Sequence, residues 1–296
     1  MKEGAVVVYR NTIRAACLLV GLSILVVIGG WAFAGAQGLQ LGIVVVIVMN
    51  GLVLFFGDSM ALRAMRARPI SEIERPELYR VVRELATEAR QPMPRLYLSP
   101  TPAPNAFATG RGPRRAVICC TTGLLRLLTE RELRGVIAHE LAHVRNRDTL
   151  LCSVAATLAA IITSMTALAL LLPLGDSEDE DVPSLLSGLL FLVLGPVAAL
   201  VIRAAVTRGR EYRADDAAAR LTGDPLGLAS ALRKIEVGAR THPLPTEGRL
   251  LASAHLMITH PFPPRGMSRI FAVHPPTRER IRRLRSMAAD GGWGLD

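Results

Sequence analysis

The sequence predicts a mostly α-helical protein with a small β-sheet, built as a multi-pass helical membrane base that carries a cytoplasmic domain. Three observations indicate this class. Four apolar stretches have about the ~20-residue length of a membrane span. The soluble segments combine helical periodicity with short apolar runs. Positive charge gathers at one set of span ends.

The net charge narrows the kinds of partner. The 296 residues carry a formal net charge of +10, and arginine supplies nearly all the positive charge because Lys2 and Lys234 are the only lysines. Such an excess is typical of proteins that bind nucleic acid, acidic substrates or membrane surfaces. Here the arginines flank apolar stretches, which favours a lipid bilayer, and no aromatic platform or motif supports nucleic-acid binding. The four cysteines form no CxxC pair, so we expect neither a disulfide framework nor a cysteine zinc site.

The apolar stretches form two pairs. They cover residues 17–36, 39–56, 150–172 and 185–205. A secretory signal peptide or a buried helical hairpin can imitate one span, but four of them favour a membrane protein. The chain is therefore expected to divide into a tail with two spans at 1–56, a soluble part at 57–149, two further spans at 150–206 and a second soluble part at 207–296.

Charge on the connecting segments predicts the orientation. The turn Gln37–Gly38 is uncharged, and the connector PLGDSEDEDVPS holds five acids and no basic residue. Basic residues crowd the opposite ends of the spans, namely Lys2, Arg10, Arg14, Arg63, Arg66 and Arg68. Because positive charge marks the cytoplasmic side, both termini and both soluble parts are expected in the cytoplasm.

Two helices are expected in the first soluble part. The run PELYRVVRELATEAR, which begins at Pro76, has apolar residues at helical spacing. Ser71 and Glu74 have the spacing of a capping box before it. A second capping box, Thr129 with Glu132, predicts the start of the next helix.

The remaining soluble elements follow from turn signals and periodicity. Short apolar runs between Pro and Gly predict strands near 95–99, 106–109 and 116–121. Helical patterns cover 210–223, the segment that starts at Asp224–Pro225, and 275–290. Residues 241–266 are rich in Pro and Gly and predict a loop.

The run HELAH, from His139 to His143, lies in the helix that Thr129 caps. Residues i and i+4 project from one helix face, so the two imidazoles can bind one metal ion while Glu140 lies beside a bound water. A solvated face with incidental histidines is the alternative. Against it, Val136 and its apolar neighbours would bury this helix, and a buried glutamate needs a partner. The motif predicts a zinc site with Glu140 as the general base.

A catalytic zinc needs a third protein ligand and an open fourth position. Thr149 stands where a third histidine would extend the motif, and the acids at 176–181 are expected on the far side of the membrane. Glu211 is the first downstream carboxylate on the correct side. At about 1.5 Å of rise per residue, it and His143 reach a similar height above the membrane. A surface ion pair with a neighbouring arginine is the alternative for Glu211.

Two further acids are candidates to orient a zinc-bound histidine. Asp215 lies one helical turn beyond Glu211, on the same face. A plain salt bridge is the alternative for Asp215. Asp148 is a weaker candidate for the same orienting role.

Four motifs in order resemble a known family. HELAH, REYRAD, the upstream PNAFATG and the late HPPTRERI resemble the HtpX family of membrane zinc endopeptidases, which is related more distantly to the CAAX prenyl protease. The resemblance covers roughly residues 10–288. It implies a gluzincin-type catalytic domain of mixed α and β structure on a helical base in a bacterial plasma membrane. The implied activity is ATP-independent endoproteolysis of misfolded or damaged membrane proteins, in quality control and the stress response.

The resemblance also implies roles for particular residues. His139, His143 and Glu211 match the family's ligands for one Zn²⁺ per chain, and Glu140 matches its catalytic base. The implied partners are membrane-protein or unfolded polypeptide substrates, the lipid bilayer and other membrane quality-control proteases.

Two more segments match the family less closely. Asn105, Ala106 and Phe107 of PNAFATG match its active-site strand, which is expected to accept an extended peptide by β-addition. An asparagine in an ordinary turn is the alternative. His274 matches a late histidine that is expected to stabilise the oxyanion, and a plain helix-start residue before Pro275 is its alternative.

Two other functions remain open from the sequence. A catalytically inert membrane scaffold would keep the fold and bind partners, but it has no physical need for a complete ligand set together with Glu140. A prenyl-protein protease would share the chemistry and act on lipidated C-termini. Four spans, in place of a larger helical chamber, disfavour that second alternative.

Overall fold

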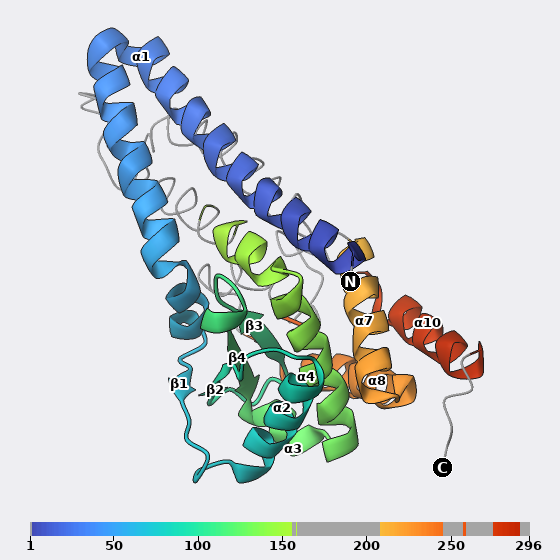
Figure 1. The fold of residues 1–296 in the computed structure, drawn as a ribbon. Helices are drawn as coiled ribbons and strands as arrows, with labels where there is room; N and C mark the ends of the chain where they lie inside the picture. The colour runs from blue at the N-terminus through green and yellow to red at the C-terminus, as the bar shows by residue number, and fades with distance from the viewer. Residues whose placement is uncertain (1, 156–157, 159–207, 245–256, 259–274, 291–296) are drawn as a thin grey trace.

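The computed structural model describes residues 2–155, 158, 208–244, 257–258 and 275–290 (Figure 1). Several sequence predictions lie outside these residues. They are the fourth span, the acidic connector, most of the third span, most of the Pro-rich segment and His274.

Helix α1 (Lys2–Ala64) folds back on itself as a hairpin of two long arms (Figure 1). Gly35 has a φ of 55°, a left-handed conformation that glycine adopts without strain. The arms lie close together, since a Cβ on Gly30 would clash with the backbone of Gly38 in the other arm. The left-handed residue therefore lies two positions before the turn expected at Gln37–Gly38.

The two arms of α1 have the length and composition of membrane spans. The apolar stretches are Val6–Ala32 and Gly35–Val53, and only 6% and 22% of their most apolar windows are buried in the described structure. Large apolar side chains such as Ile28 and Trp31 are exposed along them. A continuous exposed apolar surface of this kind fits contact with lipid and does not fit the core of a soluble domain.

A four-stranded mixed sheet follows α1. Its strands are β1 (Arg68–Pro69), β2 (Arg95–Ser99), β3 (Ala106–Thr109) and β4 (Val117–Thr121), in the order β1-β2-β4-β3. β2 and β4 are parallel, and the two outer strands pair antiparallel with their neighbours. The first two predicted strands match β2 and β3, and the third begins one residue later than expected. β1 was not predicted, because a two-residue segment is too short to show an alternation of apolar and polar residues.

Side chains from β4 are buried on both faces of the sheet. Ile118 and Cys120 pack with the helices on one face, while Val117 and Cys119 pack with the end of α1 on the other. The sheet is therefore enclosed between the end of α1 and the helices that follow in the chain, and β3 forms one of its edges.

The helices beyond β1 follow the predicted periodicity. They are α2 (Pro76–Glu88), α3 (Thr122–Leu127), α4 (Glu130–Arg145), α7 (Arg208–Thr222), α8 (Pro225–Thr241) and α10 (Thr277–Asp290), with a 3-10 turn at Pro113–Arg115. The helix α4 lies at the centre of this group and packs against α2, α7, α8 and strand β3 (Figure 1).

The two predicted capping boxes have different outcomes. Thr129 accepts from the backbone N–H of Glu132, whose carboxylate accepts from the backbone N–H of Thr129, so this box caps α4 as predicted. The Ser71–Glu74 prediction was wrong as a helix start, because α2 begins later and Arg75 caps it without a side-chain hydrogen bond. The Glu74 carboxylate instead accepts two hydrogen bonds from the guanidinium of Arg68, which is the stronger electrostatic contact.

The chain turns sharply after α4 and enters a second helical segment, residues 148–155, at the start of the predicted third span. Leu151 and Ala155 of this segment pack with Ala15, Met49 and Val53 of α1. The membrane hairpin therefore contacts the chain directly beyond the HELAH helix.

Candidate active site

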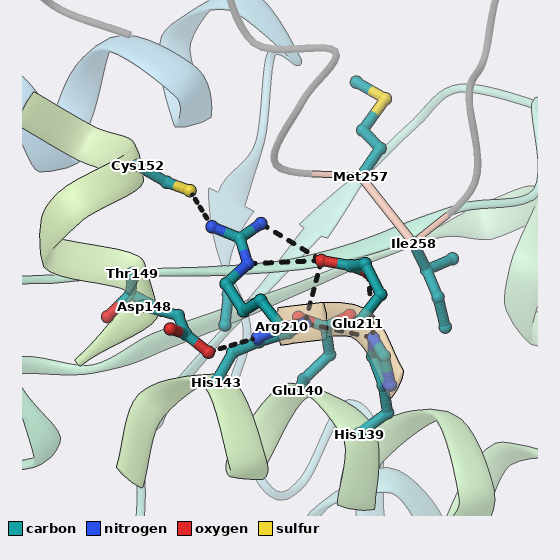
Figure 2. A pocket seen from close by; sticks show the side chains of 11 residues that line it. His139, Glu140, His143, Asp148, Thr149, Cys152, Arg210, Glu211, Met257 and Ile258 are labelled. Carbon is teal, nitrogen blue, oxygen red and sulfur yellow. Dashed lines mark hydrogen bonds and ion pairs between the residues drawn. The ribbon is translucent and has the colours of Figure 1, made fainter. Parts of the chain in front are cut away.

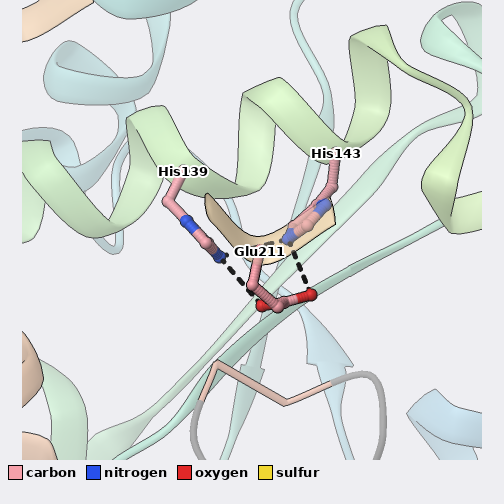
Figure 3. Close-up of side chains that lie close together, drawn as sticks. All are labelled: His139, His143 and Glu211. Atoms are coloured by element: carbon pink, nitrogen blue, oxygen red, sulfur yellow. Dashed lines mark hydrogen bonds and ion pairs between the residues drawn. The ribbon is translucent and has the colours of Figure 1, made fainter. Parts of the chain in front are cut away.

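Helix α4 carries the two histidines and the glutamate of HELAH into the interior. The exposed fractions of His139, Glu140 and His143 are 0%, 2% and 9%. One helical turn separates the imidazoles, and their Nε2 atoms face each other at 3.1 Å (Figure 3). The helix spacing thus produces the convergence that the sequence predicts.

Glu211 enters the same space from α7. Its Oε2 lies 3.8 Å from Nε2 of His139, and its Oε1 lies 3.8 Å from Nε2 of His143 (Figure 3). One ligand atom from each residue lies within 4.8 Å of the other two. Glu211 is 1% exposed, so the alternative was wrong about a surface location, although the ion pair with a neighbouring arginine is present and joins Glu211 to the buried Arg210.

A second layer of acids holds the outer nitrogen of each imidazole. Nδ1 of His139 lies 3.0 Å from Oδ1 of Asp215, and Nδ1 of His143 lies 2.9 Å from Oδ2 of Asp148. A neutral imidazole that donates its Nδ1–H to such a carboxylate directs the lone pair of its Nε2 inward, where the two Nε2 atoms face each other. Two lone pairs at this separation repel unless a cation lies between them. Two imidazoles and one carboxylate are a typical ligand set for a catalytic zinc, so the residues fit a divalent metal ion.

Burial controls the protonation of this cluster. Burial lowers the pKa of His139 to about 4, which keeps this imidazole neutral and able to bind a metal. Burial also acts to lower the pKa of His143, but the carboxylates of Glu211 and Asp148 raise it overall. Burial raises the pKa of Glu140 to about 7, the range in which one carboxyl group can both accept and donate a proton near neutral pH.

Two buried arginines brace the carboxylates. Arg280 of α10 donates from Nε and Nη2 to Asp215, at 2.8 and 2.6 Å. Arg210 donates from Nε and Nη2 to Oε1 of Glu211, at 3.2 and 3.1 Å, and from Nη1 to Sγ of Cys152 at 2.6 Å (Figure 2). Both guanidinium groups restrict the rotation of the carboxylates that contact His139 and His143.

Strand β3 lies along the cavity that these residues line. The backbone N–H of Ala108 donates to Glu140, and the carbonyl of Ala106 accepts from the backbone N–H of Ile258 at 3.1 Å. The side-chain oxygen of Asn105 also accepts from Ile258, at 3.2 Å. Phe107 packs on the opposite face of the sheet, with the end of α1. Ala108 is therefore the β3 residue that lines the cavity, Asn105 and Ala106 adjoin it through Ile258, and the side chain of Phe107 points away from it.

Sequence reasoning missed three of these residues. Arg280 precedes Leu284 by four positions, on the buried face of α10, and a charged residue on an apolar face was the available signal. Arg210 is the first residue of the run REYRAD, and the sequence suggested for it only a surface ion pair with Glu211. The backbone of Ile258 carries no pattern that predicts its contact with β3.

Comparisons with known proteins agree with this geometry. The model of Peptidase family M48 matches residues 72–288. A protein of Kineococcus radiotolerans named Protease HtpX homolog is 50% identical over 95% of this chain and 98% of its own length. Proteins of the same name from Arthrobacter sp. and Syntrophobacter fumaroxidans are 53% and 45% identical, over 78% and 93% of this chain and 79% and 98% of their own lengths.

A solved structure extends the agreement to the fold. Ste24p of S. mikatae superposes with a TM-score of 0.50 at 17% identity, over 96% of this chain and 67% of that chain. At this identity the likeness concerns the fold alone. The family model and the relatives show that this chain is a membrane metalloprotease and belongs to peptidase family M48.

Proposed function

We propose that the protein is a zinc-dependent endopeptidase that cleaves misfolded or damaged membrane proteins at the cytoplasmic face of a bacterial plasma membrane. One observation supports the metal-dependent chemistry. The Nε2 atoms of His139 and His143 and the carboxylate of Glu211 converge on one point, and Asp215 and Asp148 hold the outer nitrogens. Three protein ligands of this kind leave the fourth position of a tetrahedral zinc open for water or substrate.

Zinc bound at this point supplies Lewis-acid polarisation and lowers the pKa of water toward about 7. Glu140 accepts the proton of the attacking water and passes it to the leaving amine nitrogen. A pKa of about 7 suits both transfers. Asp215 and Asp148 keep the imidazoles in the tautomer that directs Nε2 inward. The edge of β3, at Asn105 and Ala106, is the proposed place for an extended substrate backbone, which would replace the backbone N–H of Ile258 as their hydrogen-bond partner.

Burial supports the choice of substrate. The ligand side chains His139, His143 and Glu211 are at most 9% exposed. A folded protein cannot bring a peptide bond to groups this deep, whereas an extended segment can. The site also adjoins the membrane hairpin through residues 148–155, which favours substrates already in the bilayer.

The charge pattern supports the proposed topology. Basic residues near the span ends and the acidic connector favour four spans with both termini and the active site in the cytoplasm. The similar proteins come from bacteria, which supports a bacterial plasma membrane. Other membrane quality-control proteases are the proposed protein partners.

The function is tested with purified full-length protein in lipid nanodiscs and an unfolded, fluorescently labelled membrane protein. Wild type should cleave it, lose activity with a zinc chelator and recover activity with added Zn²⁺. Glu140→Gln should keep its metal and cleave at least about 10²-fold more slowly. Activity that survives complete metal removal would contradict the metal chemistry. Equal cleavage of a folded soluble protein would overturn the substrate class and leave the metalloprotease intact.

A further inference from the structure

Asn11, near the start of α1, contacts the far end of the HELAH helix. Its side chain is 2% exposed. Its Nδ2 donates to Oδ1 of Asp148 at 2.6 Å and to the backbone carbonyl of Asn146 at 3.1 Å. Asn146 is the C-cap residue of α4, so one amide group joins the first membrane helix to the end of the metal-binding helix.

The same aspartate orients a proposed metal ligand. Asp148 is 2% exposed and uses its second oxygen, Oδ2, to contact Nδ1 of His143 at 2.9 Å. A carboxylate held at one oxygen can still rotate about its bond to the chain. With Asn11 on Oδ1 and His143 on Oδ2, the plane of the carboxylate is defined at both ends.

We propose that Asn11 is a positioning residue of the metal centre, and that the first membrane helix thereby determines how tightly the centre holds its metal. The proposal rests on the proposed function, because it assumes that His143 is a metal ligand. Asn11 acts through Asp148 and touches neither metal nor substrate.

The chemistry of asparagine fits this role. A neutral amide has two N–H donors, and Asn11 directs Nδ2 to two acceptors that lie within three residues of each other. A buried amide in an apolar helix is costly without such partners. Asparagine also leaves the negative charge of Asp148 intact, whereas a basic residue would compete with the imidazole for it.

Packing on the same helix face supports the docking of α1 at this point. Ala15 lies one helical turn beyond Asn11 and packs with Leu151 and Ala155 of the segment that follows Asp148. The hydrogen bond therefore lies at one end of a continuous apolar contact. Asn11 also lies outside residues 72–288, the part that the family model matches. The inferred contact thus comes from the membrane hairpin and not from the segment that the family model matches.

The consequence is that the metal site is complete only when the hairpin is docked. Partners that orient a metal-bound histidine typically contribute about 10–100-fold to metal affinity. Asn11 contacts Asp148 and not the histidine itself. We therefore expect it to contribute about 10-fold to metal affinity, at the low end of that range. A chain whose first helix is displaced would hold zinc weakly and cleave slowly.

The test measures Zn²⁺ affinity of the full-length protein in detergent micelles, by competition with a chromophoric chelator. Asn11→Ala and the near-isosteric Asn11→Leu should each weaken Zn²⁺ binding about 10-fold, and Asp148→Ala should weaken it about 10–100-fold. The double variant Asn11→Ala/Asp148→Ala should match Asp148→Ala within about twofold, because the two residues act in series. Asn50→Ala is the matched control, since Asn50 donates only to Ser23 within α1 among the contacts described.

The absorption spectrum of the Co²⁺-substituted protein provides a second readout. Asn11→Ala should shift the visible bands, which report the geometry of the imidazole ligands, and Asn50→Ala should leave them unchanged. Wild-type affinity in both Asn11 variants, or additive losses in the double variant, would overturn the proposal. So would loss of folding in the Asn11 variants while Asn50→Ala folds. A wild-type protein that binds no Zn²⁺ would instead contradict the proposed function itself.

Discussion

Arg280 and Asp215 form a buried bidentate ion pair. Nε of Arg280 donates to Oδ2 of Asp215 at 2.8 Å, and Nη2 donates to Oδ1 at 2.6 Å. The third nitrogen donates to the carbonyl of Ile258 at 2.8 Å. Because Asp215 also contacts Nδ1 of His139, the last described helix is linked to a proposed metal ligand through one carboxylate.

Arg280→Met should weaken both the metal site and the fold. Removing one member of a buried pair leaves the other charge uncompensated, which typically costs about 3–5 kcal/mol. Zinc affinity should fall about 10–100-fold, because Asp215 no longer has a fixed orientation. Zinc titration and urea unfolding check the two effects. Arg282→Met, an exposed change on the same helix, is the control, and wild-type zinc affinity in Arg280→Met would contradict the linkage.

Glu211→Ala should lose most of its zinc. The wild-type protein is expected to hold one Zn²⁺ per chain, and removing the only carboxylate ligand leaves two imidazoles. Elemental analysis of the dialysed protein measures the retained metal. Glu236→Ala removes a half-buried carboxylate of α8 that lies outside the site and should keep full occupancy. Full zinc content and activity in Glu211→Ala would remove Glu211 from the ligand set.

Glu140→Gln should separate metal binding from catalysis. Glutamine keeps the size of the side chain and its hydrogen-bonding capacity but cannot accept the proton of the attacking water. Zinc should stay bound while the single-turnover rate falls by at least about 10²-fold. Both quantities are measured on the same sample. A variant that holds its zinc and cleaves at the wild-type rate would show that another group is the base.

Glu132 should make the stability of the catalytic domain depend on acidic pH. Burial acts to raise its pKa, but hydrogen bonds from Lys234, Thr129 and Ser230 outweigh burial and lower the pKa to about 2. Since this lies below the ordinary value of 4.5, the stabilisation is complete above about pH 4.5 and is lost as the pH falls toward 2. The full contribution is about 3 kcal/mol at most.

Unfolding of wild type and Glu132→Gln, followed from pH 7 to pH 2, measures this contribution. The difference in unfolding free energy between the two should be constant above about pH 4.5 and should narrow as the pH falls toward 2. Glu236→Gln, on helix α8, controls for the loss of a carboxylate that is only half-buried and pairs with Arg240. A pH-independent difference would show that packing, rather than the charge of Glu132, stabilises this contact.

Reporter fusions should reveal the orientation of the chain. A reporter inserted at 176–181 is expected outside the cytoplasm, because that segment is acidic and lies between the third and fourth predicted spans. A reporter at 110–115, between β3 and β4, is expected in the cytoplasm. The reverse pattern would overturn the topology and the exclusion of the acidic connector as a source of the third ligand.

The local elements were predictable because their signals are short in range. Helix spacing places His139 and His143 on one face, and the Thr129–Glu132 box sets the start of the helix that carries them. β2 and β3 were predicted at their observed bounds from apolar runs between turn residues. β1 was missed because it has only two residues. They form a strand only because they pair with β2, which lies far along the chain.

The sequence by itself predicted the HELAH ligands, the general base and the candidacy of Glu211, because helix periodicity and the order of spans limit where a third ligand can come from. Only the tertiary structure decided what holds them. Arg280 meets Asp215 across 65 positions, and Asn11 meets Asp148 across 137. Such contacts depend on how helices dock, and docking is decided by packing summed over whole faces, so a local pattern can mark Arg280 as buried but cannot identify the partner of Arg280 or of Asn11.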